Sequence, residues 1–241
     1  MTSSRRRSAF SALALTAAAV LIAGCAQSPA SPPPTSTPGQ SASANPTVPG
    51  SDGGDIETAW IDDGRGFAII TWGSSTCVPV LGDVTADGQT IAVTLSNNDE
   101  KVCTDDLVPR GLFVSTPDGV DVTQDVDVQV DYAPRSQGVD LDALAEAPQG
   151  ISEQQPSAGW FEDDGITLLT WGSSTCPPVI EDIDHTDAGA TITFATVDRV
   201  CTMDFVPRVT AIMLPREHDD DAPFELTLRG DNLDGKVAVV G

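Results

Sequence analysis

Positively charged residues are scarce in this chain. Its 241 residues include 12 Lys and Arg against 36 Asp and Glu, a formal net charge of −24. A protein that binds nucleic acid needs positive charge to neutralise phosphates, and an acidic surface is repelled by them. The composition therefore excludes nucleic acid as a partner, and a charged partner is expected to be a basic protein or a divalent cation.

Histidine is also rare, and no two cysteines have the Cys-x-x-Cys spacing. Because zinc sites are built mainly from these residues, a zinc site is not predicted. Carboxylates that could supply oxygen ligands for calcium lie in two groups, Asp182, Asp184 and Asp187, and residues 219–221. They do not follow the spacing of an EF-hand, and a solvated acidic loop is the simpler interpretation. We predict neither a metal nor a cofactor.

The chain has no apolar run long enough to span a membrane as a helix. The longest, from Ala9 to Ala23, is shorter than the roughly 20 residues that a span requires. Three arginines precede this run and Gly24-Cys25 follows it, which is the pattern of an export signal rather than of a membrane helix.

The end of this run, Leu21-Ile22-Ala23-Gly24-Cys25, resembles the lipobox of bacterial lipoproteins. The resemblance implies that Cys25 receives a diacylglycerol and becomes the new N-terminus after cleavage. Two acyl chains anchor a protein stably, so we expect attachment to the plasma membrane, with the protein on its extracellular face. The alternative is ordinary secretion, and the sequence leaves the Sec and twin-arginine routes open.

One segment of the sequence occurs twice. Thr71 to Cys77 returns unchanged as Thr170 to Cys176, and Val-Cys-Thr recurs around Cys103 and Cys201. Exported cysteines usually form disulfides, and the repeat selects the pairs Cys77 with Cys103 and Cys176 with Cys201 among the three possible pairings. Each repeated unit, called copy 1 and copy 2 below, is therefore predicted to contain one disulfide.

Alternating apolar residues predict that both copies are built of strands. Ile91, Val93 and Leu95 alternate with polar or small residues, as do Val126, Val128 and Val130, and the same holds for Phe224, Leu226 and Leu228. Asp-Gly turn signals separate several of these runs. Only Val139 to Ala147 has a helical pattern.

The fold class is therefore predicted to be all-β, with two tandem small antiparallel domains of sandwich or barrel type. A single fused sandwich is the alternative. The expected segments are a signal peptide at 1–24, a lipidated cysteine with a disordered tether rich in Pro, Ser and Thr at 25–55, copy 1 at 56–135, a linker at 136–156 and copy 2 at 157–241.

The repeated Trp-Gly-Ser-Ser-Thr-Cys segment is interpreted as a structural anchor. A nucleophilic serine needs a neighbouring base, and the only histidines, His185 and His218, both belong to copy 2. The tryptophan is expected to pack against the disulfide, and the hydroxyl groups to satisfy turn amides. Ligand contact is the lesser alternative, with these candidate residues: Ser74, Ser75, Arg110, Ser173, Ser174 and Arg208.

A second shared block pairs Asp106 with Arg110 and Asp204 with Arg208. We expect an ion pair beside each disulfide, with binding of an anionic group by the arginines as the alternative. The segment Trp171 to Pro178 also resembles a motif of uncharacterised secreted lipoproteins of actinobacteria. This resemblance implies a location but no activity.

The sequence thus predicts no catalytic residues and no enzyme. The expected function is that of a lipid-anchored envelope protein that binds an extracellular protein or a small ligand. Two alternatives are an envelope hydrolase with a site at His185 or His218, and a structural spacer.

Overall fold

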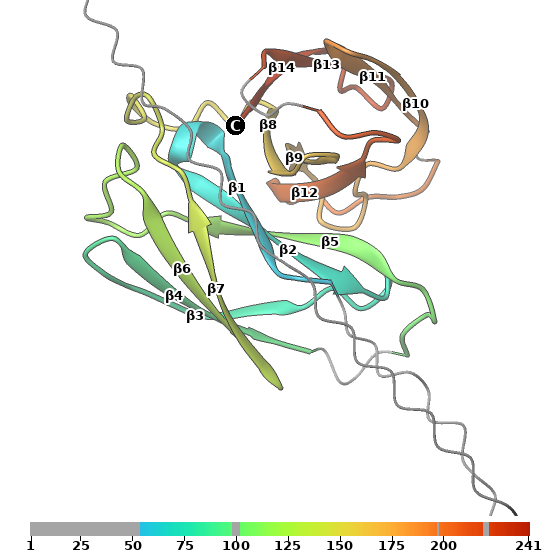
Figure 1. Cartoon of the computed structure of the whole chain (residues 1–241). Helices are drawn as coiled ribbons and strands as arrows, with labels where there is room; N and C mark the ends of the chain where they lie inside the picture. Colours follow the sequence, from blue (N-terminus) through green and yellow to red (C-terminus); the bar gives the residue numbers. More distant parts are fainter. Residues whose placement is uncertain (1–53, 98–101, 197, 219–221) are drawn as a thin grey trace, which may run out of the picture. The chain divides into compact units, whose positions relative to one another are not determined.

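The computed structural model describes residues 54–97, 102–196, 198–218 and 222–241, and these residues form an all-β structure (Figure 1), as predicted. No helix among them has the length and apolar character of a membrane-spanning segment. Cys25, the signal peptide and most of the expected tether lie outside the described residues.

Copy 1 forms two sheets that enclose a core. The sheets have the strand orders β1-β2-β5 and β3-β4-β6-β7. The elements are β1 (Glu57–Ile61), the 3-10 turn η1 (Asp62–Gly64), β2 (Gly66–Gly73), β3 (Val80–Asp87), β4 (Thr90–Ser96), β5 (Val108–Ser115), β6 (Val126–Tyr132) and β7 (Arg135–Leu141). The alternating residues of β4 and β6 point into this core with Phe67 and Ile69 of β2, which confirms the predicted inward faces.

Copy 2 repeats this strand order in a single sheet of order β10-β11-β13-β14-β8-β9-β12. Its strands are β8 (Ser157–Glu162), β9 (Gly165–Gly172), β10 (Ile180–Thr186), β11 (Gly189–Phe194), β12 (Val206–Met213), β13 (Phe224–Arg229) and β14 (Gly235–Val240). The sheet is continuous because β14 pairs with β8 in parallel. Between the equivalent strands β7 and β1 of copy 1, the side-chain amide of Gln137 bonds both the N–H and the C=O of Ile56, at 3.1 and 3.0 Å.

The sheets are mixed rather than purely antiparallel. After β4 the chain crosses to the other sheet as β5 and returns as β6, so β4 and β6 run in the same direction and pair in parallel. In copy 2 the intervening strand β12 lies at the far end of the same sheet, and β11 and β13 likewise pair in parallel.

The expected helix over Val139 to Ala147 is wrong. Residues up to Leu141 belong to β7, which pairs with β6 along its whole length, and the next residues form no helix. Pairing with a strand distant from the local pattern satisfies the backbone of this segment and overrides its helical periodicity. Copy 1 therefore includes a strand that runs past residue 135.

The two copies pack against each other through an apolar cluster of their own. Its buried members are Ala59, Ile61, Ala68, Ile70, Phe161 and Leu169. They come from β1 and β2 of copy 1 and from β8 and β9 of copy 2. Strands β2 and β9 consequently have no solvent-facing side: alternate residues face the core of their own copy and the other copy. Such strands have continuous apolar sequences.

Equivalent residues of the two copies meet in this interface. Gly111 and Val209 occupy the same position in β5 and β12, and a Cβ on Gly111 would lie 2.2 Å from Val209 Cγ1. Likewise, a Cβ on Gly159 would lie 3.4 Å from the Cβ of its counterpart Ala59. At each of these positions one copy has a small residue where the other has a larger one, which lets the sheets approach closely.

The two ends of the β1–β8 contact differ: one end has a hydrogen bond between the strands, and the other brings acidic side chains together. At one end the N–H of Asp62 donates to Ser157 Oγ at 2.8 Å. At the other end, burial and the negative charges of Glu162 and Asp55 raise the pKa of Glu57 to about 7.

We expect Gly111→Val to destabilise the protein by about 1–3 kcal/mol, because the added side chain overpacks the contact with Val209. Urea unfolding would measure the loss. The double variant with Val209→Ala should recover part of it, and Gly235→Ala, whose Cβ would meet no atom closer than 4.0 Å, is the matched control. An unchanged unfolding midpoint for Gly111→Val would contradict the packing between copies.

Candidate functional site

The structure contains both predicted disulfides. Cys77 is bonded to Cys103 and Cys176 to Cys201, with Cα atoms 5.4 and 5.7 Å apart. Each disulfide joins the segment after the second strand of its copy to the segment before the fifth. We call these regions disulfide loop 1 (residues 74–79 and 102–107) and disulfide loop 2 (residues 173–179 and 200–205).

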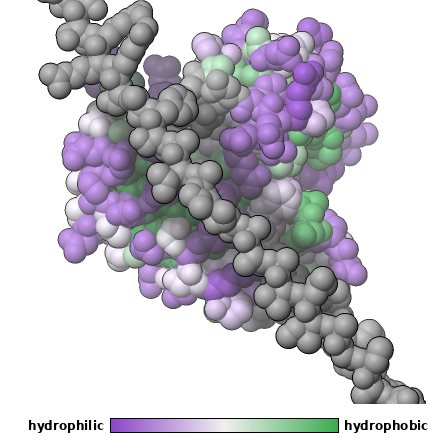
Figure 2. Space-filling view, in the orientation of Figure 1, coloured by the Kyte–Doolittle hydropathy of each residue, from purple (hydrophilic) through white to green (hydrophobic). Residues whose placement is uncertain are grey.

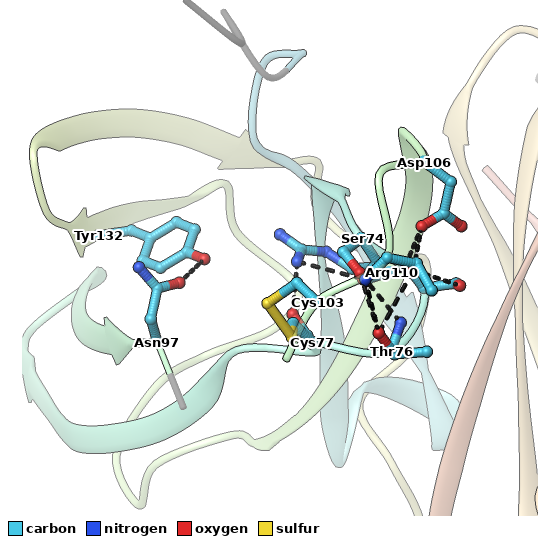
Figure 3. Close-up of a disulfide and its surroundings, with 10 residues drawn as sticks. Ser74, Thr76, Cys77, Asn97, Cys103, Asp106, Arg110 and Tyr132 are labelled. Atoms are coloured by element: carbon cyan, nitrogen blue, oxygen red, sulfur yellow. Dashed lines mark hydrogen bonds between the residues drawn. A yellow bond between two sulfur atoms is a disulfide. The ribbon is translucent and has the colours of Figure 1, made fainter. Parts of the chain in front are cut away.

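Thr104 forms the centre of the hydrogen-bond network in disulfide loop 1, and its partners Ser74, Thr76 and Asp106 are labelled in Figure 3. The hydroxyl of Thr104 donates to the carboxylate of Asp106 and lies 2.8 Å from Ser74 Oγ. Its backbone N–H donates to Thr76 Oγ1 at 3.0 Å, and the N–H of Ser75 donates to Asp106 Oδ1 at 3.2 Å. The serine side of the loop is thereby tied to the cysteine side independently of the disulfide.

Disulfide loop 2 repeats this network. Thr202 bonds to Asp204, lies 2.7 Å from Ser173 Oγ and donates its N–H to Thr175 Oγ1 at 3.0 Å. Ser174 N–H donates to Asp204 Oδ1 at 3.2 Å. The repeated hydroxyl groups therefore brace turns, as the structural interpretation expects.

The expected ion pair between Asp106 and Arg110 is wrong, because the two side chains bond to different groups. Arg110, on β5, turns its guanidinium under the loop and donates to the carbonyl oxygens of Cys77 and Trp72, at 2.5 and 3.1 Å, and to Thr71 Oγ1 at 3.3 Å. Asp106 stays on the exposed side of the loop with Thr104. The arginine thus holds backbone carbonyl groups in place of a carboxylate.

Copy 2 shows the same arrangement, so the predicted pair of Asp204 with Arg208 is also wrong. Arg208 donates to the carbonyl oxygens of Cys176 and Trp171, at 2.7 and 3.1 Å. Burial lowers the pKa of Arg208, and the negative charge of Asp231 opposes that shift.

Hydrogen bonds to the two loop carboxylates lower their pKa values. Bonds from Ser174 and Thr202 lower the pKa of Asp204 to about 2, and bonds from Thr104 and Ser75 lower the pKa of Asp106. Both networks are therefore intact at neutral pH.

Large apolar side chains are exposed on both disulfide loops. Val102 and Val200 are 95% and 98% exposed, and Met203 is fully exposed. Leu107 and its counterpart Phe205 are more than half exposed, and Phe205 stacks on Trp171 with ring centroids 6.3 Å apart. Elsewhere, on the face shown in Figure 2, hydrophilic residues dominate and hydrophobic ones form separate patches.

The tryptophans of the repeated motif differ in their surroundings. Trp171 also contacts Phe113 of copy 1, at 6.0 Å between ring centroids, within the cluster that joins the copies. Trp72 lies against Gly54, where a Cβ would be 2.5 Å from its ring.

The candidate contact residues do not share one cavity. Arg110 lines a pocket of about 200 Å³, whose wall does not include Ser74 or Ser75. Those serines are on the exposed loop, as are Ser173 and Ser174 in copy 2. Sequence reasoning thus found Arg110 but missed the rest of this pocket, which comes from residues far apart in the chain.

A larger cavity of about 570 Å³ lies between the copies, beside η1. Asp62 and Asp63 there have positive φ angles of 51° and 54°. Its two basic side chains have partners within the chain: Arg65 bonds to Asp63, and Lys236 bonds to Glu225. The wall also includes Glu146 and several apolar residues, so it presents no excess of positive charge to a ligand.

The two histidines of the hydrolase alternative, His185 and His218, have different contacts. His185 Nε2 accepts a hydrogen bond from Arg216 Nε at 3.1 Å. His218 packs its ring on Trp160 and Phe224, at 5.9 and 4.8 Å between centroids. Neither imidazole is hydrogen-bonded to a serine among the described residues.

The acidic groups considered for calcium do not form a cluster of metal ligands. Among the described residues, no group of three or more His, Cys, Asp or Glu side chains is placed to hold a metal ion. Asp187 is paired with Arg216 at 2.9 Å, and residues 219–221 lie outside the described part.

Comparisons with protein-family models, with curated proteins and with solved structures find no match for this chain. The loop threonines could have been identified from the sequence, because both copies have Thr directly after the second cysteine.

We expect Asp204→Asn to speed hydrogen exchange of the Ser174 amide about fivefold or more, because the amide loses a charged acceptor. In the unchanged protein, the pKa below 3.8 means that the network is stable above about pH 4 and lost as the pH falls through about 2. Exchange followed by NMR would test both statements. Asp182→Asn, an exposed change of the same charge, is the control, and equal exchange in all three proteins would contradict the bracing role.

Proposed function

We propose that this chain is a non-enzymatic, lipid-anchored protein of the cell envelope that binds an exported protein through its two disulfide loops. Lipidation at Cys25 would hold it on the extracellular face of the plasma membrane. Two disulfides support the location, because such bonds persist in oxidising compartments outside the cytoplasm.

The exposure of apolar side chains on braced loops is the observation that supports binding of a protein. Val102 and Val200 occupy equivalent positions and are both almost completely exposed. Exposed apolar groups that gather in one place are typical of interaction surfaces. A disulfide and a threonine network already fix each loop, so little conformational entropy remains to be lost when a partner binds.

The net charge of the chain limits the class of partner that it can attract. A chain with a net charge of −24 attracts a basic protein and repels nucleic acid or anionic lipid. We therefore propose a basic exported protein that places apolar side chains against the loops. The hydrolase centred on His185 or His218 and the structural spacer are the alternatives.

Capture experiments on the intact envelope would test this function. We expect crosslinking to join the protein to a specific basic partner, and the double variant Val102→Ser with Val200→Ser to reduce capture about tenfold or more. Ile151→Ser is the matched control, because Ile151 is 86% exposed but lies on neither loop. Equal capture by both variants would refute the loop interface, and no capture by any protein would favour the spacer.

The anchor has its own test. We expect Cys25→Ser to abolish incorporation of labelled palmitate and to leave the signal segment uncleaved, which the mass of the purified protein would show. Cys176→Ser with Cys201→Ser is the control, since it removes a disulfide but leaves the lipobox intact. Incorporation of palmitate that persists in the Cys25→Ser variant would refute lipid attachment at this residue.

A further inference from the structure

The pocket beside Arg110 has a composition unlike the rest of the molecule. It measures about 200 Å³, and its wall includes Arg110, Arg135, Asn97, Trp72 and Tyr132. None of the described residues of this wall is an acid, although the chain has 36 acids and only 12 basic residues. Two of its few arginines thus meet at one small cavity.

Arg110 is a buried cation that has only neutral partners among the described residues. Its side chain is 8% exposed, and its Nη groups donate to carbonyl and hydroxyl oxygens. Its Nε is buried without a hydrogen-bond partner in the described structure, and the same holds for Nε of Arg208 in copy 2. Buried charges are normally matched by an opposite charge, since carbonyl dipoles replace only part of the lost hydration.

Copy 2 shows how such a cation is balanced within the chain. The equivalent arginine, Arg208, makes the same contacts with carbonyl groups and is also near the negative charge of Asp231. Asp231 lies in the connection between β13 and β14. The equivalent connection in copy 1, between β6 and β7, carries no acid, and β7 begins there with Arg135.

The opposite wall of the pocket is aromatic and well defined. Tyr132, at the end of β6, donates its hydroxyl to Asn97 Oδ1, which fixes the ring beside the cavity. In Figure 3 the guanidinium end of Arg110 lies on the side of the disulfide that faces Tyr132 and Asn97. Trp72, Leu107 and Pro134 complete an apolar lining.

We propose that this pocket binds a small organic monocarboxylate, with its carboxylate facing the guanidinium of Arg110 and its apolar body between Trp72 and Tyr132. The volume is several times the roughly 30 Å³ of a water molecule, which suits a group of about ten non-hydrogen atoms. Most of the wall is apolar, so a carboxylate that carries an apolar body fits better than phosphate. Arg135 adds positive charge at the same wall. This site goes beyond the proposed partner of the loops and does not depend on it.

Benzoate is a suitable probe, with benzamide as its neutral analogue and inorganic phosphate as the competing anion. NMR titration of the full chain in detergent, read at the indole N–H of Trp72, should show saturable binding of benzoate at least about tenfold stronger than that of benzamide. The Trp171 signal should not change, because copy 2 supplies its own carboxylate.

Variants locate the site. Arg135→Gln and Tyr132→Ala should each weaken benzoate binding about tenfold, whereas Arg216→Gln, with the same change of charge outside the pocket, should not. Equal effects of Arg135→Gln and Arg216→Gln, equal binding of benzamide, or a response to phosphate alone would overturn the proposal. None of these readouts requires substitution of Arg110, whose contacts with the loop carbonyl groups support the fold.

Discussion

The whole arrangement depends on burial of both faces of β2 and β9. Ile69 points into the core of copy 1, whereas Ile70 beside it points into the cluster shared with copy 2. If the copies separated, each would expose a continuous apolar strand to water, at a cost of about 25 cal/mol for each Å² uncovered. The two repeats are therefore parts of one folded unit, even though each has its own core and disulfide.

Packing between repeats also explains why their sequences differ where they touch. In a symmetric dimer, a residue near the two-fold axis meets its own copy, so a large side chain there would collide with itself. A tandem duplication removes this restriction. Gly111 can then face Val209, and Gly159 can face Ala59, in a closer contact than two identical residues would allow.

Much of the fold could be predicted because its signals are local or repeated. Alternation in β4 and β6 indicated the inward faces, and the repeat selected the disulfide pairs. The run Phe67 to Ile70 lacks alternation, which is typical of a strand buried on both faces, but a short apolar run cannot show what covers it. The helix prediction at Val139 was wrong because this segment pairs with β6 as strand β7. The local periodicity of a sequence carries no information about such a pairing.

The site was harder to predict because it depends on the direction of side chains. Asp106 and Arg110 are close in sequence, yet one lies on the exposed side of the loop and the other turns beneath it. Tyr132 and Arg135 reach the pocket only through the pairing of β6 with its neighbours, a contact that no spacing in the sequence indicates. Long-range strand order, rather than composition, places an aromatic wall opposite the buried guanidinium.

The two disulfide loops share their internal bracing but present different surfaces. Leu107 in copy 1 corresponds to Phe205 in copy 2, and Asp105 corresponds to the fully exposed Met203. Loop 2 therefore offers more apolar area and one negative charge fewer than loop 1. When a partner has bound one loop, the second loop is held close to it at a high effective concentration, which strengthens the overall binding. This gain requires a partner whose surface fits both loops, although the two loop surfaces differ. For the proposed partner, the same bracing with unequal surfaces favours one asymmetric protein over two identical ligands, and we expect the larger apolar area of loop 2 to contribute more of the binding energy.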